Sequence, residues 1–240
     1  MNALKTTFLT IFCAIFAVGT LSSCLGDGDS YQYTGPTQEE KHQACLEVSG
    51  TYTGKLHFQD VSNVGSQKED SVDVRWSVLD STLVMDNFPV SVLSKYIYNA
   101  SVKSTVAQAP TMNLVAKFPL AETYTVQGTN NKYYQFYLLP FLDKEMKCTF
   151  SFTSTETDAT GTPFEKNNTA TITFVTDMTY MSTPLYAVAA YQTITGKDNV
   201  AKKQLKFNLL ISEMSVNNVT YTIRTAFGVV GTKSSFSEME

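Results

Sequence analysis

Alternation of apolar and polar side chains, repeated in segment after segment, most constrains how this chain of 240 residues can fold. From Gly50 onward, apolar residues occupy every second position, which is typical of β-strands with one buried face. The pattern covers residues 52–58, 72–78, 112–118, 134–138, 148–152, 170–174, 205–211 and 219–227. Clean alternation favours antiparallel sheets, because strands of parallel sheets tend to be apolar throughout. The sequence therefore predicts a mainly β, antiparallel fold with Trp76 facing inward.

Turn residues between these segments favour a meander of hairpins. Asp80-Ser81 and Asn217-Asn218 both suit tight connections. Residues 185–194 are apolar on both faces and predict a central strand covered on each side. The polar stretch 154–168 predicts the longest loop. Either a β-barrel or a two-sheet sandwich agrees with this meander, and the sequence leaves both open.

Two helices are expected in addition to the strands. Thr37-Gln38-Glu39-Glu40 matches a capping box and predicts a short helix that runs to about Glu47. After Pro89, apolar residues recur at helical spacing and predict one further helix that plugs a barrel or covers a sheet. The residues that define this second pattern are Val92, Leu93, Tyr96, Ile97 and Ala100.

The N-terminus has the features of a cleaved export signal. Lys5 precedes an apolar run, and small residues follow that run. From Phe8 to Leu21 the run has about 14 residues, fewer than the roughly 20 that span a bilayer as a helix. Residues 1–23 are therefore predicted to be a signal peptide, and a permanent transmembrane helix is the weaker interpretation.

Leu21-Ser22-Ser23-Cys24 resembles the bacterial lipobox. This resemblance implies that diacylglycerol is attached to the Cys24 thiol and that cleavage precedes this residue. Several acyl chains anchor a protein stably, whereas one holds it only reversibly. Residues 25–29 resemble the acidic segment that favours surface display of Bacteroidetes lipoproteins. We therefore expect an outer-membrane lipoprotein at the cell surface, with the periplasmic leaflet as the alternative.

These features divide the chain into three parts. A signal peptide (1–23) precedes a lipidated tether (24–36), which contains Gly, Asp, Ser and Pro without periodicity. Residues 37–240 are predicted to form a single β-rich domain. A candidate boundary within this domain lies near residues 110–122.

Charge and composition argue against several classes of function. The 18 Lys and Arg residues are scattered singly among 22 Asp and Glu residues, so we expect no nucleic-acid partner. The chain has two histidines and lacks phosphate-loop and metalloprotease motifs, so we expect no metal and no cofactor. His57 has no carboxylate near it in sequence to orient it as a base. Acids available to a hydrolase, though nothing in the sequence pairs them, are Asp60, Asp73, Asp86, Glu122, Asp177 and Glu213.

Cys45 and Cys148 are the thiols that remain after the predicted processing. Both lie on apolar sides of their predicted elements, and an exported protein meets an oxidising compartment. A disulfide between them is therefore a candidate. Two separate buried thiols are the alternative, because cysteine often serves as a small apolar residue.

Three tyrosines are candidate ligand-facing residues. Tyr133 and Tyr137 lie on the strand face opposite Tyr134 and Phe136, and Tyr186 belongs to the segment that is apolar on both faces. An outward row of tyrosines is what a sugar-stacking platform requires. The alternative is that a second packed layer covers this face.

Cys24 with its signal, Gly50-Thr51-Tyr52-Thr53-Gly54 and Met85-Asp86-Asn87-Phe88-Pro89 together resemble uncharacterised Bacteroidetes surface lipoproteins with a domain of unknown function. Some of these proteins have calycin-like β-barrels whose first strand opens with Gly-x-Tyr-x-Gly. The resemblance implies a location and an architecture, and it implies no chemistry.

The sequence thus favours a non-enzymatic, lipid-anchored envelope protein. We expect the membrane as one partner, through the lipid on Cys24, and a glycan or a protein as the other. A structural or accessory subunit of an envelope complex is the first alternative. A carboxylate-dependent hydrolase is the second.

Overall fold

The computed structural model describes residues 35–60, 68–125, 132–140, 146–180, 183–195 and 200–234. The helices are α2 (Gln38–Val48), the 3₁₀ helix η1 (Val90–Tyr96) and α3 (Ala100–Ala107). The first strands are β1 (Gly50–Asp60), β2 (Lys68–Leu79), β3 (Thr82–Pro89), β4 (Thr111–Lys117), β5 (Leu120–Thr125), β6 (Lys132–Tyr137) and β7 (Leu139–Pro140). The later strands are β8 (Lys147–Thr157), β9 (Pro163–Phe174), β10 (Asp177–Tyr180), β11 (Thr183–Tyr186), β12 (Val188–Thr195), β13 (Ala201–Val216) and β14 (Val219–Lys233).

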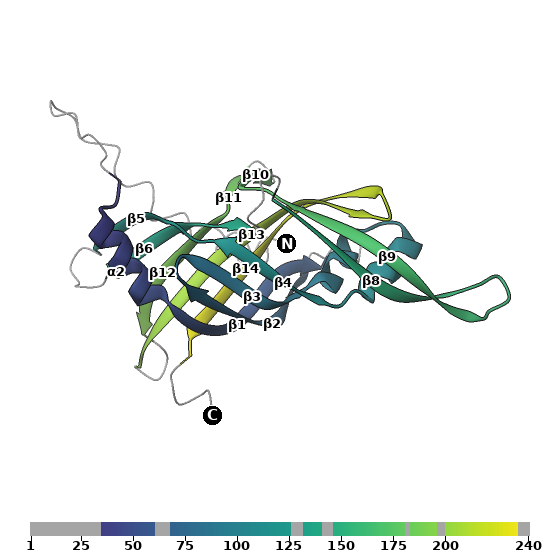
Figure 1. Cartoon of the computed structure of the whole chain (residues 1–240), viewed down its shortest axis with the longest axis horizontal. Coiled ribbons are helices and arrows are strands. Elements are labelled where there is room, and N and C mark those ends of the chain that lie inside the picture. Colours follow the sequence, from purple (N-terminus) through teal and green to yellow (C-terminus); the bar gives the residue numbers. More distant parts are fainter. Residues whose placement is uncertain are drawn as a thin grey trace.

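The fold is mainly β and antiparallel, as the alternation predicted. One sheet runs in the order β5-β6-β12-β13-β14-β1-β2-β3-β4-β7, and β9 joins it beside β13 with β8 at its outer side. β10 and β11 pair separately. The path does not return from β7 to β5, so the barrel alternative is wrong and the architecture is consistent with a β-sandwich (Figure 1).

The sheet folds over on itself to enclose the core. Trp76 on β2 and Phe207 on β13 are separated in the sheet by β1 and β14, yet their ring centroids lie 5.4 Å apart. The Trp76 indole is fully buried and stacks on Tyr52 at 5.6 Å, which confirms its inward position. Gly54 pairs with Gly231 beside it, and a Cβ on Gly231 would lie 2.4 Å from Trp76 Cη2. This glycine pair therefore leaves the space that the indole occupies.

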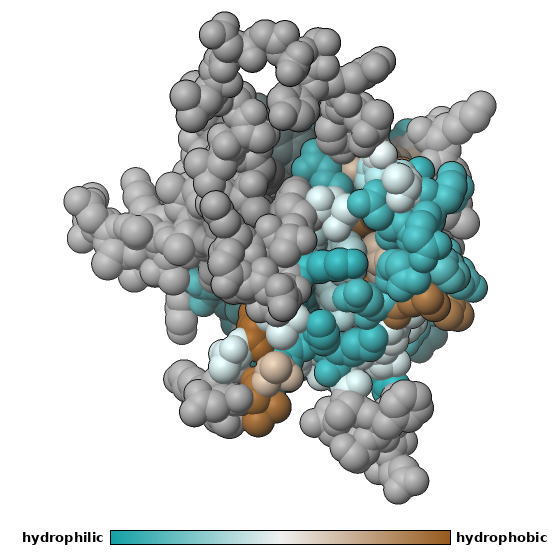
Figure 2. Space-filling view, turned by 90° about the vertical axis from the view of Figure 1, so that its left-hand side faces the viewer, coloured by the Kyte–Doolittle hydropathy of each residue, from teal (hydrophilic) through white to brown (hydrophobic). Residues whose placement is uncertain are grey.

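Helix α2 begins with the predicted capping box. Thr37 Oγ1 accepts from Glu40 N at 3.2 Å, and Glu40 Oε2 accepts from Thr37 N at 2.8 Å. Ala44 and Val48 are buried, so this short helix covers one end of the sandwich (Figure 1). Figure 2 looks onto this end, where the described surface is largely hydrophilic with small, separate hydrophobic spots.

The single helix expected after Pro89 is two helices. The 3₁₀ helix η1 ends at Tyr96, and α3 begins after Asn99. Asn99 Oδ1 accepts from Val102 N at 3.1 Å, and this new N-cap explains why the chain restarts rather than continuing one helix. Val92, Leu93 and Ile97 are nevertheless buried, as the apolar pattern predicted.

Residues 154–168 are not the predicted loop, because they belong to the hairpin of β8 and β9. Only its turn lacks strand structure, and there Asp158 Oδ1 accepts from Thr160 N at 2.8 Å and from Thr162 N at 2.9 Å. The hairpin projects beyond the rest of the sheet, at the end of the long axis opposite α2 (Figure 1).

Two other sequence-based expectations are confirmed at least in part. Asp80-Ser81 and Asn217-Asn218 are two-residue turns with positive φ angles, as tight hairpins require. The apolar segment 185–194 is divided at Ala187 into two strands, β11 and β12. β11 pairs with β10, whereas β12 lies between β6 and β13. Residues 188–191 of β12 are buried, which agrees with a strand covered on both faces.

Candidate functional site

The three tyrosines proposed to face a ligand do not form one exposed row. Tyr137 is 53% exposed and Tyr186 is 47% exposed, but Tyr133 is only 6% exposed. Burial also raises the pKa of Tyr133. Tyr133 is therefore not exposed to a ligand, and a stacking platform of all three residues is wrong.

Cys45 and Cys148 are not disulfide-bonded. Cys45 Sγ lies 3.0 Å from Ser81 Oγ, in the turn between β2 and β3. Cys148 packs at the margin of the core on β8. Because α2 covers one end of the sandwich and does not cross the sheet toward β8, the helix keeps the two thiols apart (Figure 1). The candidate disulfide is thus not formed.

His57 has an orienting carboxylate that sequence reasoning missed. His57 Nδ1 lies 3.2 Å from Glu69 Oε1, and both side chains are half-buried. The register of β1 and β2 places Ser71 opposite His57, so Glu69, two residues earlier, lies on the same face. Only the register could have revealed this contact, because the two residues belong to different strands.

Asn208 is an unusual buried residue of the sheet. Its side chain is fully buried, and neither its Nδ2 nor its Oδ1 has a hydrogen-bond partner. Gly228 on β14 lies opposite Asn208. Lys206 belongs to β13, as Asn208 does, and desolvation lowers the pKa of its ammonium group. A buried carboxamide without partners costs free energy that an apolar side chain would not.

The projecting end of the sheet presents a surface that we call the hydroxyl face. Register relations place one row, Thr149, Thr171, Ser215 and Thr220, on four successive strands. Thr149 Oγ1 and Thr171 Oγ1 lie 2.8 Å apart. The hydroxyl face consists of Thr149, Ser151, Thr153 and Thr155 on β8, Thr169, Thr171 and Thr173 on β9, Ser215 on β13, and Thr220 and Thr222 on β14.

The opposite side of this extension is apolar and holds it to the core. Phe152, Ile172 and Met214 are buried there, next in sequence to residues of the hydroxyl face. The strands therefore alternate as a one-sided sheet does. Threonine and serine predominate in the middle of their exposed face, and Lys147, Glu165 and Glu213 lie on the same face around them. The sequence does contain this signal, because residues 147–157 alternate Thr or Ser with larger side chains as far as Phe152.

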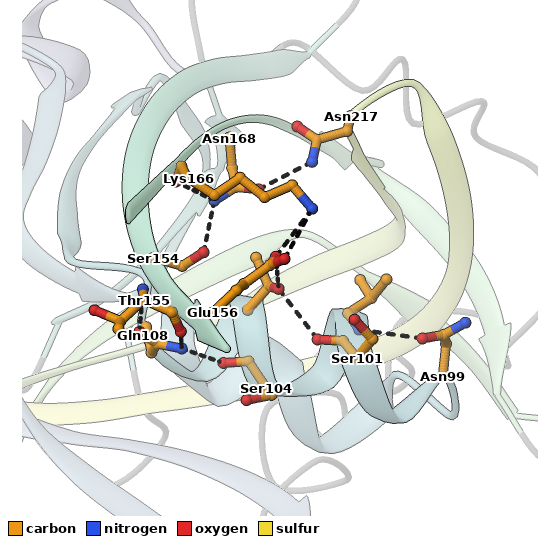
Figure 3. A network of polar contacts seen from close by, with 12 residues as sticks. Asn99, Ser101, Ser104, Gln108, Ser154, Thr155, Glu156, Lys166, Asn168 and Asn217 are labelled. Carbon is orange, nitrogen blue, oxygen red and sulfur yellow. Dashed lines mark hydrogen bonds and ion pairs between the residues drawn. The ribbon is translucent and has the colours of Figure 1, made fainter. Parts of the chain in front are cut away.

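Carboxamide side chains attach the β8–β9 hairpin to its neighbours (Figure 3). Gln108, just after α3, accepts from Thr155 N at 2.9 Å and donates to Thr155 O at 3.2 Å, as a neighbouring strand would. Asn217 Nδ2 donates to Asn168 Oδ1 at 2.9 Å, and Asn217 Oδ1 accepts from Thr169 N at 3.0 Å. The hydroxyl face is thus supported by contacts from α3 and from the β13–β14 turn.

A tyrosine cluster at the other end positions α2. Tyr134 OH donates to Glu47 Oε1 at 2.9 Å, and Tyr191 OH donates to Glu47 O at 2.8 Å. Tyr52 OH donates to Val48 O, and Lys233 Nζ donates to Glu47 O at 3.0 Å. Tyr191, Lys233 and Tyr52 thus satisfy carbonyl groups at the end of the helix, which have no partner within it, whereas Tyr134 holds the Glu47 side chain.

No three His, Cys, Asp or Glu side chains of the described residues are grouped so that they could hold a metal ion. Of the acids considered for hydrolysis, Asp73 Oδ1 pairs with Lys55 Nζ at 2.8 Å and Glu213 Oε1 accepts from Thr173 Oγ1 at 3.3 Å. No helix in the described part of the chain is both long and apolar enough to cross a bilayer.

These features define a class of antiparallel β-sandwich in which helix α2 covers one end and a hydroxyl-rich hairpin projects from the other. The chain belongs to the family described as domain of unknown function (DUF4840), whose model matches residues 47–216. The match extends from the last turn of α2 through β13 and therefore includes the whole β8–β9 hairpin. Comparison with curated proteins gives no match, and comparison with solved structures gives none either.

Proposed function

We propose that this chain is a non-enzymatic, lipid-anchored cell-surface protein that binds a neutral glycan through its hydroxyl face. The observation that carries the proposal is the placement of the two ends: α2, which follows the tether, and the β8–β9 hairpin lie at opposite ends of the long axis (Figure 1). A lipid on Cys24 would direct the hydroxyl face away from the membrane.

The tether limits how far the sandwich can stand from the bilayer. Residues 25–36 can span at most about 40 Å when fully extended. The end covered by α2 is therefore the one nearer the membrane in this proposal. The resemblance of Leu21-Ser22-Ser23-Cys24 to a lipobox and that of the following acidic segment to surface lipoproteins support this arrangement.

The chemistry of the hydroxyl face supports a neutral carbohydrate ligand. Each threonine or serine hydroxyl offers one donor and two acceptor positions, as sugar hydroxyls do. Strand spacing sets these groups about 4.8 Å apart across the sheet and about 7 Å apart along a strand. The row from Thr149 to Thr220 contains no charged side chain, so a neutral polymer that binds along this row desolvates no ion there; Glu213 lies in the next row, between Thr173 and Thr222.

Metabolic labelling with an alkyne fatty acid tests the anchor. The wild type and Cys13→Ala should both carry the label, because Cys13 lies within the predicted signal, whereas Cys24→Ala should not. Equal labelling of Cys24→Ala would contradict lipidation at this residue.

Affinity electrophoresis through gels that contain neutral or acidic polysaccharides tests the ligand. The wild type should be retarded by at least one neutral polysaccharide, and the Thr220→Ala/Thr222→Ala variant should lose most of that retardation. The matched control is Thr53→Ala, an exposed threonine on β1. Retardation by acidic polymers alone, or full retention in the double variant, would contradict the proposal.

A further inference from the structure

We propose that two copies of this chain join edge to edge through β8, antiparallel and related by a two-fold axis at Ser151. This interface would extend one sheet into the other. The inference goes beyond glycan binding and requires neither the lipid nor the ligand.

The backbone of β8 offers open hydrogen-bonding groups along its outer edge. Gln108 pairs with both N and O of Thr155, so these groups point away from β9. Because backbone direction alternates along a strand, the groups of Thr149, Ser151 and Thr153 point to the same edge. Among the described residues, no strand other than β9 pairs with β8. This edge is therefore a template for another strand.

The open edge lacks the features that usually protect such strands. Residues 149–154 contain no charged side chain and no proline, both of which commonly prevent edge-to-edge pairing. Gln108 ends the open stretch at Thr155 by taking the place of a neighbouring strand. Gln108 thus closes the distal part of the edge, and no other described strand pairs with the part before it.

The sequence of this open stretch is symmetric about Ser151. Residues 149–153 are Thr-Phe-Ser-Phe-Thr, which reads the same in both directions. Antiparallel pairing with a second copy therefore places Thr149 opposite Thr153, Phe150 opposite Phe152, and Ser151 opposite itself. Threonine pairs and aromatic pairs both stabilise antiparallel sheets. A two-fold interface requires such self-complementarity, and a random partner strand would not supply it.

Charges at the two ends of β8 agree with the same register. Lys147 begins the strand, and Thr155, near its other end, is paired with Glu165 on β9. The two-fold arrangement brings Lys147 of one copy opposite Thr155 of the other, beside Glu165. Each side of the axis would then carry one Lys147 and one Glu165, two strands apart and of opposite charge. Because partners across an antiparallel pair share a face, the two hydroxyl faces become one continuous surface.

Cysteine cross-linking of the full chain in detergent tests the register directly. Ser151 meets itself in a hydrogen-bonded pair, where Cα atoms lie about 5.5 Å apart, within the range that a disulfide bridges. Ser151→Cys should therefore give a covalent dimer on mild oxidation. The wild type controls for the native cysteines, and Thr220→Cys, exposed on β14, controls for random collision.

Two further variants fix the orientation. Thr149→Cys should not cross-link with itself, because the two positions would lie about 14 Å apart along the strands. A mixture of Thr149→Cys and Thr153→Cys chains should cross-link. Ser151→Lys, which places like charges opposite each other, should leave a folded monomer by circular dichroism and sedimentation.

The proposal is overturned if folded Ser151→Cys stays monomeric, if Thr220→Cys dimerises equally, or if Thr149→Cys alone dimerises as well as the mixture. None of these outcomes depends on glycan binding, because the variant used to test that function, Thr220→Ala/Thr222→Ala, lies on β14 and away from the β8 edge.

Discussion

At the scale of single residues, Gly231 decides whether the indole of Trp76 fits the core. A Cβ at this position would lie 2.4 Å from both Trp76 Cη2 and Thr53 O, and the backbone of β1 cannot move away without breaking its pairing with β14. Gly231→Ala should therefore destabilise the protein by about 1 to 3 kcal/mol through overpacking. Urea unfolding, followed by the fluorescence of the single tryptophan, measures this loss.

Gly35→Ala is the matched control, because a Cβ at Gly35 would meet no atom within 4 Å. Its unfolding midpoint should equal that of the wild type within error. Equal midpoints for Gly231→Ala and the wild type would mean that the contact between β1, β14 and Trp76 is looser than 2.4 Å distances require.

Asn208 leads to a prediction of the opposite sign. Replacing a buried, unpartnered carboxamide by an apolar side chain of similar shape removes its desolvation cost. Asn208→Leu should therefore raise the free energy of unfolding by about 1 to 3 kcal/mol. Asn113→Leu, at an exposed position of β4, serves as control and should change it little. A destabilised Asn208→Leu would show that this carboxamide does have a partner in solution.

Sequence patterns correctly predicted the environment of a residue when that environment depends on the two-residue period of a strand. They failed when the environment depends on the register between neighbouring strands. Trp76 was placed correctly because alternation alone assigns its face. Tyr133 also alternates, but its burial depends on what covers the second face of β6. His57 and Glu69 meet only because β1 and β2 pair in one particular register. A shift of that register would separate them without any change of sequence pattern.

At the scale of elements, the attachment of α2 should be sensitive to alkali. Burial raises the pKa of Tyr52, Tyr134 and Tyr191 above the ordinary tyrosine value of 10.0, and Glu47 adds to the effect for the last two. The folded state thus favours the neutral phenols. Their contribution to stability is fully present below about pH 10, where the unfolded tyrosines are also neutral, and is lost progressively as pH rises above that value.

Urea unfolding on both sides of that pH measures this dependence. Tyr191→Phe should be less stable at neutral pH, because it lacks the hydrogen bond to Glu47 O, but should lose less stability in alkali. Tyr98→Phe, at a highly exposed tyrosine, should behave as the wild type does. An identical alkaline loss in Tyr191→Phe would assign the effect to other groups.

The β8 edge should depend on one side chain after α3. Gln108→Ala leaves Thr155 N and O without their partner, so amide hydrogen exchange in residues 151–157 should accelerate while β1 and β2 stay protected. Gln43→Ala is a suitable control, because Gln43 bonds only within α2, to Glu39 Oε1 at 2.8 Å. Unchanged exchange in Gln108→Ala would show that the edge needs no such support.

Elements were predicted best where their own side chains determine them. α2 follows from its capping box, and most strands follow from alternation. Residues 154–168 were misassigned because both faces of the distal hairpin are polar, with Ser154, Glu156 and Lys166 opposite its threonines. Long-range contacts from Gln108 and Asn217 hold them as strands, and no local pattern encodes those. The helix after Pro89 was misdivided because its apolar spacing does not reveal the N-cap of Asn99.

At the scale of the whole molecule, the separation of the two ends predicts which turns are accessible on intact cells. A short epitope inserted in the exposed β8–β9 turn, after Thr160, should bind antibody readily, because it points away from the proposed anchor. The same epitope at the Asp80-Ser81 turn, near α2, should bind less on cells and equally after detergent extraction. The reverse order would contradict the orientation, and no binding before lysis would indicate the periplasmic leaflet.

Uncharged side chains attach the β8–β9 hairpin to the rest of the molecule. Three carboxamides, from Gln108, Asn168 and Asn217, make four of the hydrogen bonds that link the hairpin to the end of α3 and to the β13–β14 turn (Figure 3). Carboxamides carry no charge to titrate, and their hydrogen bonds are not screened by salt as ion pairs are. The projecting end should therefore keep its geometry in brine and in mild acid alike, a form of environmental tolerance that an attachment by ion pairs would lack.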